Sequence, residues 1–369
     1  MNNKQQWPPF QEAKAVSFIL FLTGKILIRK NFLLCWHNHA SIDYVSNRIH
    51  KRERGLLSSN TMFPNKLSLA AYITVCLVWG STYLAIRIGV AHLPPALFAG
   101  IRFLLAGAIL LLILLWRGVS LPQNSSDFKH AFIVGAFLLF GGNGCIAWAE
   151  QFVVSSLTAL IIAALPLFVA LLDTFWPGGN RMSTLGWLGM LVGFSGVAIL
   201  VAPGIFNQHM DVRGIGGVLL GTIFWAAGSV YSNRYPPGCS IWMGAAIQNL
   251  SGGLLLTTVG LLAGEYNRFH LNSQGILAIT YLVLFGSLAA YSAFIYILHT
   301  MPPAKASTYA YINPVVAVVL GYLILQEPVS WRMLLAAAVI LAGVLMVQLS
   351  RTSPQTPSKA LQPVKSVKV

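Results

Sequence analysis

The feature that most limits the fold of this chain is a succession of apolar segments, each about as long as a bilayer is thick. Ten such windows follow Leu67, at residues 68–90, 94–116, 129–149, 154–176, 184–203, 213–234, 240–263, 274–298, 303–325 and 330–350. A spanning helix needs about 20 mostly apolar residues. Only 9% of the residues are charged and the mean hydropathy is +0.70, whereas soluble domains are roughly 25% charged. The sequence therefore predicts an all-α membrane protein with ten transmembrane helices.

The excess of positive charge indicates anchoring in the membrane and not binding to nucleic acid. The formal net charge of +15 is concentrated at the two ends and in the short gaps between apolar windows. Basic residues that flank membrane spans gather on the cytoplasmic side. With the N-terminus inside, that side receives Lys66, Arg117, Lys129, Arg181, Arg234, Lys305 and Arg351. We therefore expect a multi-pass protein of the bacterial cytoplasmic (inner) membrane, with both termini in the cytoplasm.

Two sequence motifs recur at one offset and indicate an internal repeat. Pro166 and Pro314 each lie within an apolar window, 148 positions apart, and the same offset relates Gly80-Ser81-Thr82-Tyr83 to Gly228-Ser229-Val230-Tyr231. Ten windows divide into five per copy, at 66–203 and 213–350, and an odd number makes the second copy enter from the opposite side. The sequence thus predicts two inverted five-helix repeats, an arrangement that supports alternating access around a central site.

The two ends of the chain differ from the repeats. Residues 1–61 form an atypical leader whose apolar run, Ala15 to Ile28, is shorter than a span. We expect this leader to be disordered or to lie outside the functional unit, with Met62 as the true start; an amphipathic segment on the membrane surface is the alternative. Residues 351–369, rich in proline and lysine, are expected to be a disordered cytoplasmic tail.

Two charged residues within or beside the windows are candidates for transport. Arg102 lies about a third of the way along the second window, where an unpaired charge costs at least ~2.5 kcal/mol. It would bind a substrate anion or a transport carboxylate, or else serve a structural role by bonding helix carbonyls. Glu150 ends the third window and is the candidate proton-coupling residue, with a solvated helix end as the alternative.

Aromatic and amide side chains complete the predicted substrate-binding site. Trp79 and Tyr83 lie one helical turn apart, as do Tyr309 and Asn313 just before Pro314. Asn143 sits among glycines in the third window, and a proline removes a backbone donor and breaks helical bonding. We expect helix breaks at Pro166 and Pro314 and a cavity lined by Trp79, Tyr83, Arg102, Asn143, Trp225, Tyr231, Tyr309 and Asn313.

The chain carries no recognisable catalytic or cofactor-binding motif. It has no Walker loop, no His-Glu-x-x-His and no serine elbow, and its four cysteines lack the spacing of a metal site. We therefore expect no enzymatic activity, no cofactor and no metal. Glu327, which follows the ninth window, either starts the tenth helix or acts as a gate at the outer rim.

Several segments together resemble a known family. These are "VWGSTYLAIRIG" from Val78, "AGIRFLLAG" from Ala99, "LPLFVALL" from Leu165, "YAYINPVVAVVLGYLILQEP" from Tyr309 and the closing "AGVLMV". They resemble the EamA family of the drug/metabolite transporter (DMT) superfamily, and bacterial inner-membrane permeases in particular. The resemblance implies ten helices in two inverted halves, a central cavity and export by secondary transport. Residues that match recurrent family positions are Trp79, Arg102, Glu150, Pro166, Asn313, Pro314 and Glu327.

The sequence departs from the family at two places. The leader has no family counterpart, and Gly179-Asn180-Arg181 stands where a glutamate resembling Glu327 is common, so symmetric gating by such a pair is doubtful. We expect a secondary transporter that exports a small metabolite, amino acid or drug, with proton coupling. An uncoupled facilitator and an integral-membrane lipid-handling protein are alternatives. The expected partners are a small-molecule substrate and the lipid bilayer, without nucleic acid, and a homodimer is compatible with the sequence.

Overall fold

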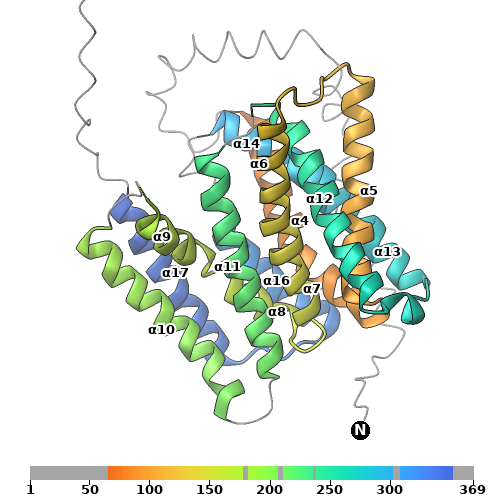
Figure 1. The fold of residues 1–369 in the computed structure, drawn as a ribbon. Coiled ribbons are helices and arrows are strands. Elements are labelled where there is room, and N and C mark those ends of the chain that lie inside the picture. The colour runs from red at the N-terminus through yellow and green to blue at the C-terminus, as the bar shows by residue number, and fades with distance from the viewer. Residues whose placement is uncertain (1–64, 178–181, 207–210, 236–237, 302–307, 352–369) are drawn as a thin grey trace, which may run out of the picture.

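A computed structural model describes residues 65–177, 182–206, 211–235, 238–301 and 308–351. Within these ranges the chain forms helices and connecting turns, without a strand (Figure 1). The expected leader and tail lie outside the described residues, and so does the segment Gly179-Asn180-Arg181.

The first half contains five helical spans, two of which are divided. They are α4 (Lys66–His92), α5 (Pro95–Trp116), a third span made of α6 (Ser125–Gly135), the π-helix η1 (Ala136–Asn143) and α7 (Gly144–Ala149), a fourth made of α8 (Ser155–Ile162) and α9 (Leu165–Phe175), and α10 (Thr184–Phe206). Each follows one of the apolar windows, because helices satisfy all their backbone groups internally.

The second half has the same order of elements. It consists of α11 (Val212–Arg234), α12 (Ile241–Leu262) followed by the short helix η2 (Glu265–Arg268), a span made of α13 (Ser273–Tyr281), the π-helix η3 (Leu282–Ala289) and α14 (Ala290–Thr300), then α16 (Tyr309–Leu325) and α17 (Trp331–Arg351). A π-helical stretch thus lies in the third span of both halves. Such stretches are uncommon and often mark functional sites.

The count of membrane-spanning helices is confirmed only in part. Nine helical spans of the described residues are long and apolar enough to cross a bilayer, and α16, with 17 residues, is shorter. The ninth predicted window began at residue 303, but residues 302–307 are not described, and the described helix begins at Tyr309. The observed architecture is therefore an all-helical, multi-pass membrane protein for which the number ten is not established.

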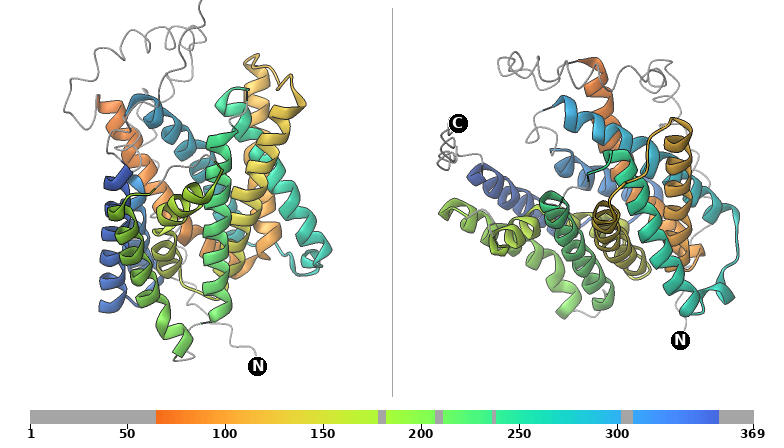
Figure 2. Two further views of the ribbon diagram at one scale, coloured as in Figure 1. Left: turned by 60° about the vertical axis from the view of Figure 1, so that its left-hand side comes forward. Right: turned by 45° about the horizontal axis from the view of Figure 1, so that its top comes forward.

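Counterpart helices of the two halves pack against each other through glycines. The second spans, α5 and α12, lie side by side, and so do the fifth spans, α10 and α17 (Figures 1 and 2). A Cβ atom on Gly253 would lie 2.7 Å from the Leu104 backbone nitrogen, and one on Gly343 would overlap the Gly193 backbone. Small residues let membrane helices approach this closely. Gly189, Gly193 and Gly343 therefore serve helix packing.

The two prolines affect their helices differently. The fourth span is interrupted between Ile162 and Leu165, and Pro166 then stands in the first turn of α9, where its missing N–H costs nothing. Pro314, in contrast, lies inside the continuous helix α16, so the predicted break at Pro314 is wrong. Because Pro314 is the sixth residue of its helix, only one backbone hydrogen bond near the helix start is lost.

Candidate functional site

Three aromatic rings from three helices meet in a group that we call the aromatic cluster. Trp79 of α4, Phe294 of α14 and Tyr309 of α16 have ring centroids 5.0, 5.2 and 5.5 Å apart in the three pairs. All three side chains are only partly buried. Trp79 Nε1 donates a hydrogen bond of 3.2 Å to the Gly286 carbonyl in η3. The cluster therefore joins the first, eighth and ninth spans at one place.

Asn313 connects α16 to α4 next to the aromatic cluster. With its amide oriented so that nitrogen faces two carbonyls, Asn313 Nδ2 lies 3.2 Å from the oxygens of both Tyr309 and Cys76. A Cβ atom on Gly80 would lie 2.6 Å from Val316 Cβ, so the two helices touch one turn away. The amide supplies a donor near the turn that Pro314 weakens, so in the structure it ties two helices together.

Arg102 reaches the same region from α5. Gly100, Leu104 and Gly107 press against α12, and Arg102 lies about 200° around the helix from Gly100. Its side chain is therefore turned away from α12 and towards η3. Arg102 Nη2 is 3.6 Å from the place where a Gly286 Cβ would stand, so Gly286 adjoins both the guanidinium and the Trp79 indole.

Glu265 caps the helix that carries Arg102. Glu265, in η2, accepts hydrogen bonds from the backbone nitrogens of Ala96 at 3.4 Å and Leu97 at 2.8 Å. These nitrogens belong to the first turn of α5, where a helix has unpaired donors and a partial positive charge. The position of Arg102 thus depends on a carboxylate cap contributed by the other half of the chain.

Glu150 is fully buried at the end of the third span, with 0% of its surface exposed. Neither carboxylate oxygen has a hydrogen-bond partner among the described residues. Glu150 interacts electrostatically with Arg87, Glu327 and Arg102, and Tyr83 interacts with Glu150 and Tyr309. The expectation of a solvated helix end is wrong, because neighbouring helices cover this carboxylate.

Arg87 is the residue of this site that the sequence analysis missed. It stands in the last turns of α4, and its guanidinium Nη1 donates to the backbone carbonyl of Glu150. A charged residue five positions before the end of a span is a signal that could have indicated it. Arg87 was passed over because arginines near span ends are usually solvated anchors.

Glu327 does not cap the tenth helix, and its role as a gate stays a prediction. Its Oε1 accepts from the Ser155 backbone nitrogen and from Ser155 Oγ, both at 2.8 Å, and its Oε2 accepts from the Ser156 nitrogen at 2.9 Å. The carboxylate, 1% exposed, caps the first turn of α8. A Cβ atom on Gly321 would lie 2.5 Å from Glu327 Oε2. Glu327 therefore caps the N-terminus of α8 and not that of the tenth helix, which follows it in sequence.

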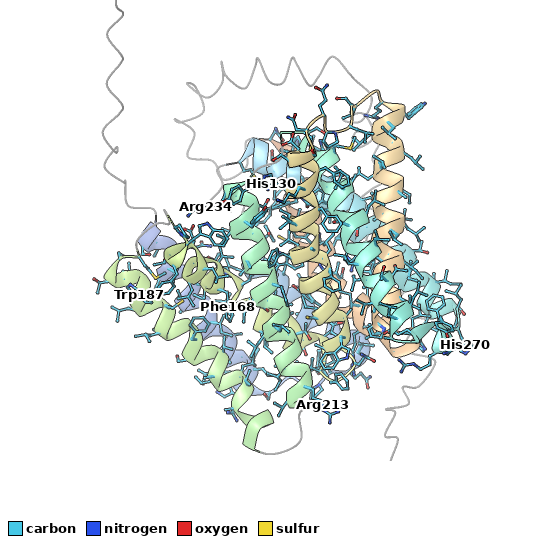
Figure 3. All side chains as sticks on the ribbon, in the orientation of Figure 1. His130, Phe168, Trp187, Arg213, Arg234 and His270 are labelled. Carbon is cyan, nitrogen blue, oxygen red and sulfur yellow. The ribbon has the colours of Figure 1, made fainter. Side chains whose placement is uncertain are left out.

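Tyr231 lies away from this group. Its hydroxyl is 2.7 Å from His130 Nδ1, and its ring is 4.8 Å from that of Tyr235. Gly214, near the start of α11, packs on Val153, just beyond Glu150, whereas Tyr231 is near the other end of the same helix. Figure 3 shows Arg213 and His130 at opposite ends of the bundle. The structure thus places Tyr231 and Glu150 at opposite ends.

Asn143 of the third span follows a glycine that packs on Trp225 of the sixth span. A Cβ atom on Gly142 would lie 3.1 Å from Trp225 Cε3, and Asn143 Nδ2 donates to the Leu138 carbonyl at 3.3 Å. Of the eight residues predicted to line a cavity, the structure connects five. Trp79 and Arg102 adjoin Gly286 of η3, and Tyr309 packs on Trp79. The Asn313 amide lies beside Tyr309, and Tyr83 interacts with Tyr309. The cavity itself stays a prediction.

No cluster of three or more metal-ligating side chains occurs in the described part of the chain. Three of the cysteines, Cys76, Cys145 and Cys239, are free thiols.

Comparison with known proteins identifies the family. The model of the EamA-like transporter family matches residues 66–202 and again 212–349. The chain is 39% identical to the uncharacterised inner membrane transporter YedA of Escherichia coli (strain K12), over 76% of this chain and 90% of that one. It is 24% identical to the uncharacterised transporter YoaV of Bacillus subtilis (strain 168), over 74% and 94% of the two chains.

A solved crystal structure has the same fold, with a TM-score of 0.55 at 23% identity over 77% of this chain and 97% of that one. The two matched stretches cover most of the chain and correspond to its two halves, which have the same order of helical elements. The resemblance inferred from the motifs is thereby confirmed: the chain belongs to the EamA-like transporter family.

Proposed function

We propose that this protein is a secondary transporter that exports a small metabolite, amino acid or drug across the bacterial cytoplasmic membrane by alternating access, coupled to protons. A general transporter role follows from the family. The membrane is proposed from the name of the E. coli relative, and the direction from the export that the family resemblance implies. The orientation with both termini in the cytoplasm is proposed from the distribution of lysine and arginine.

Glu150 is the observation that supports proton coupling most directly. Its carboxylate is fully buried and unpartnered among the described residues, and burial of this kind disfavours the charged form. Two arginines, Arg87 and Arg102, act on it in the opposite sense. Burial favours the protonated carboxyl and the two arginines favour the ionised carboxylate. Glu150 can therefore take up and release a proton when its surroundings change, as alternating access requires.

The packing at the Glu150 end of the bundle is consistent with a closed gate. α8 packs against both α4 and α16, and α7 packs against α4 and α5. Glu327 and Arg87 tie these elements together through the hydrogen bonds described above. At the other end, α14 packs on α4 and α9 packs on α11. Opening would require the ties at the Glu150 end to break together.

Flux through the purified full-length protein in proteoliposomes tests this function. Vesicles loaded with a mixed pool of amino acids and metabolites are followed by mass spectrometry, with and without a pH gradient. We expect gradient-dependent loss of at least one compound. In Glu150→Gln, gradient-driven flux should fall to that of empty vesicles while counterflow of the same compound persists.

The Glu150→Asp variant is the matched control, because it keeps an ionisable carboxylate and should keep the dependence on the gradient. Full gradient-driven flux in Glu150→Gln would remove Glu150 from the coupling step. If uncouplers do not change the equilibration of substrate by the wild-type protein, the protein is instead an uncoupled facilitator. Absence of any flux would contradict the transporter function proposed here.

A further inference from the structure

Arg102 is a buried cation whose guanidinium carbon lies 4.6 Å from the centroid of the neighbouring Phe103 ring and which has no hydrogen-bonding partner among the described residues. Its side chain is 7% exposed, its Nε atom is fully buried, and no hydrogen bond or ion pair joins the guanidinium to any other described residue. An arginine that served structure by bonding helix carbonyls would show such bonds. A charge at this depth is costly, so an unpartnered guanidinium indicates a group that arrives with a ligand.

The charges around Arg102 leave one positive charge unbalanced. Glu327 is satisfied by three hydrogen bonds at the start of α8, where the helix terminus offsets its charge. In the state in which Glu150 is ionised, the two guanidiniums of Arg87 and Arg102 interact with one unpartnered carboxylate, that of Glu150. A single negative charge brought by a ligand would balance the group.

The aromatic cluster gives that ligand a second point of contact. Gly286 adjoins Arg102 on one side and accepts the Trp79 indole hydrogen bond on the other. Gly286 therefore lies between the guanidinium and the Trp79 indole, and the partly exposed rings of Phe294 and Tyr309 pack on that indole. Aromatic faces and edges accept another ring in stacked or edge-to-face geometry. The site thus offers an anion receptor next to an apolar, ring-binding wall.

We propose that the substrate is a small ring-bearing carboxylic acid of net charge −1, with its carboxylate on Arg102 and its ring on the aromatic cluster. The proposal rests on the transporter function proposed above and specifies its substrate class. Arginine binds carboxylates through two parallel hydrogen bonds. A phosphate monoester, with about −1.5 to −2 charges, would exceed the unbalanced charge. A zwitterion would bring an ammonium group towards two arginines.

A binding series that keeps the ring and changes the charge tests this inference. Radiolabelled phenylacetate, phenylalanine and phenethylamine carry −1, 0 and +1 on similar phenyl frameworks. Binding to the full-length protein in detergent micelles avoids diffusion of the probes through lipid. We expect phenylacetate to bind most tightly and phenethylamine most weakly. Loss of charge-assisted hydrogen bonds in Arg102→Gln should weaken phenylacetate binding roughly 10- to 100-fold.

The controls separate recognition from structure. Arg213→Gln removes a positive charge from an exposed position at the start of α11 and should leave the order of the three probes unchanged. Arg102→Lys should retain the preference for the anion with lower affinity. If Arg102→Gln does not fold, the order of the three probe affinities in the wild-type protein and in Arg102→Lys still tests the proposed substrate class.

The outcomes distinguish this inference from the proposed function. Tighter binding of phenylalanine or phenethylamine, or an unchanged order in Arg102→Gln, would overturn the substrate class while gradient-driven flux stands. Binding of none of the three probes by a protein that transports other compounds would overturn it as well. Absence of flux from a protein that binds phenylacetate would instead contradict the transport proposal alone.

Discussion

The carboxylate cap of Glu327 on α8 predicts different changes in stability when Ser155 and Ser156 are replaced by alanine. Ser155 Oγ donates to Glu327 Oε1 at 2.8 Å, whereas Ser156 Oγ is fully buried and has no partner among the described residues. A hydrogen bond to a charged group contributes about 1.5–3 kcal/mol. Since Oε1 keeps its bond from the Ser155 nitrogen, Ser155→Ala should lower the free energy of unfolding by about 1.5–2 kcal/mol, the lower part of that range.

Ser156→Ala should have little effect or stabilise the protein. It removes a buried hydroxyl without a partner, a group whose burial costs about 1–3 kcal/mol by mutational measures. The backbone nitrogen of residue 156 still donates to Glu327 Oε2 at 2.9 Å. Both serines are fully buried and adjacent, so the pair controls for side-chain volume and for position in α8.

Reversible unfolding in mixed detergent and SDS micelles, followed by helical circular dichroism, measures both variants. The expected result is a difference of at least about 1.5 kcal/mol between them, with Ser155→Ala the less stable. Equal destabilisation of the two variants would refute the reasoning, because it would show that packing of small side chains and not the carboxylate cap sets the stability of α8. Ser155→Ala indistinguishable from wild type would refute it too.

Two further predictions concern helix packing and the far end of the bundle. Gly343→Ala forces a Cβ against the Gly193 backbone and should destabilise by about 1–3 kcal/mol; Gly216→Ala, where nothing lies within 4 Å of the added Cβ, should stabilise by up to about 1 kcal/mol. The same unfolding titration measures both, and comparable losses would contradict the close approach of α10 and α17. Arg234→Gln breaks a partly exposed ion pair of 2.9 Å with Asp173 and should change stability by less than about 1 kcal/mol; a larger, salt-independent loss would mean that this pair is a buried structural tie.

Much of the fold could be predicted because the bilayer imposes a simple rule on sequence. Helical segments of about 20 apolar residues are read directly from composition; the window at 94–116, for example, corresponds to the helix Pro95–Trp116. The break near Pro166 was expected from the lost backbone donor. Pro314 was misjudged, because its effect depends on its place within α16 and on the Asn313 amide beside it.

The π-helical stretches η1 and η3 were not predicted, since no residue pattern we used distinguishes them from α-helix. The site was predictable only as a set of residue types. Arg102 and Glu150 stood out because charge in or beside an apolar segment is rare. Trp79 and Tyr309 stood out because each has a polar side chain one helical turn away in an apolar segment. Arg87 carried the same signal, a charge in an apolar segment, but its place near the span end also fits an anchor, and Ser155 gave no signal.

By itself, then, the sequence determined that the chain is a doubled, helical membrane protein of the EamA-like family, because hydropathy, repeat offset and motifs are local properties of the chain. Only the tertiary structure decided which polar groups meet. Glu327 caps α8 and Glu265 caps α5, Tyr231 pairs with His130, and the buried Arg102 Nε has no hydrogen-bond partner among the described residues. These relations join residues on different helices, and helix packing through small residues, which the spacing along one segment does not encode, brings them together.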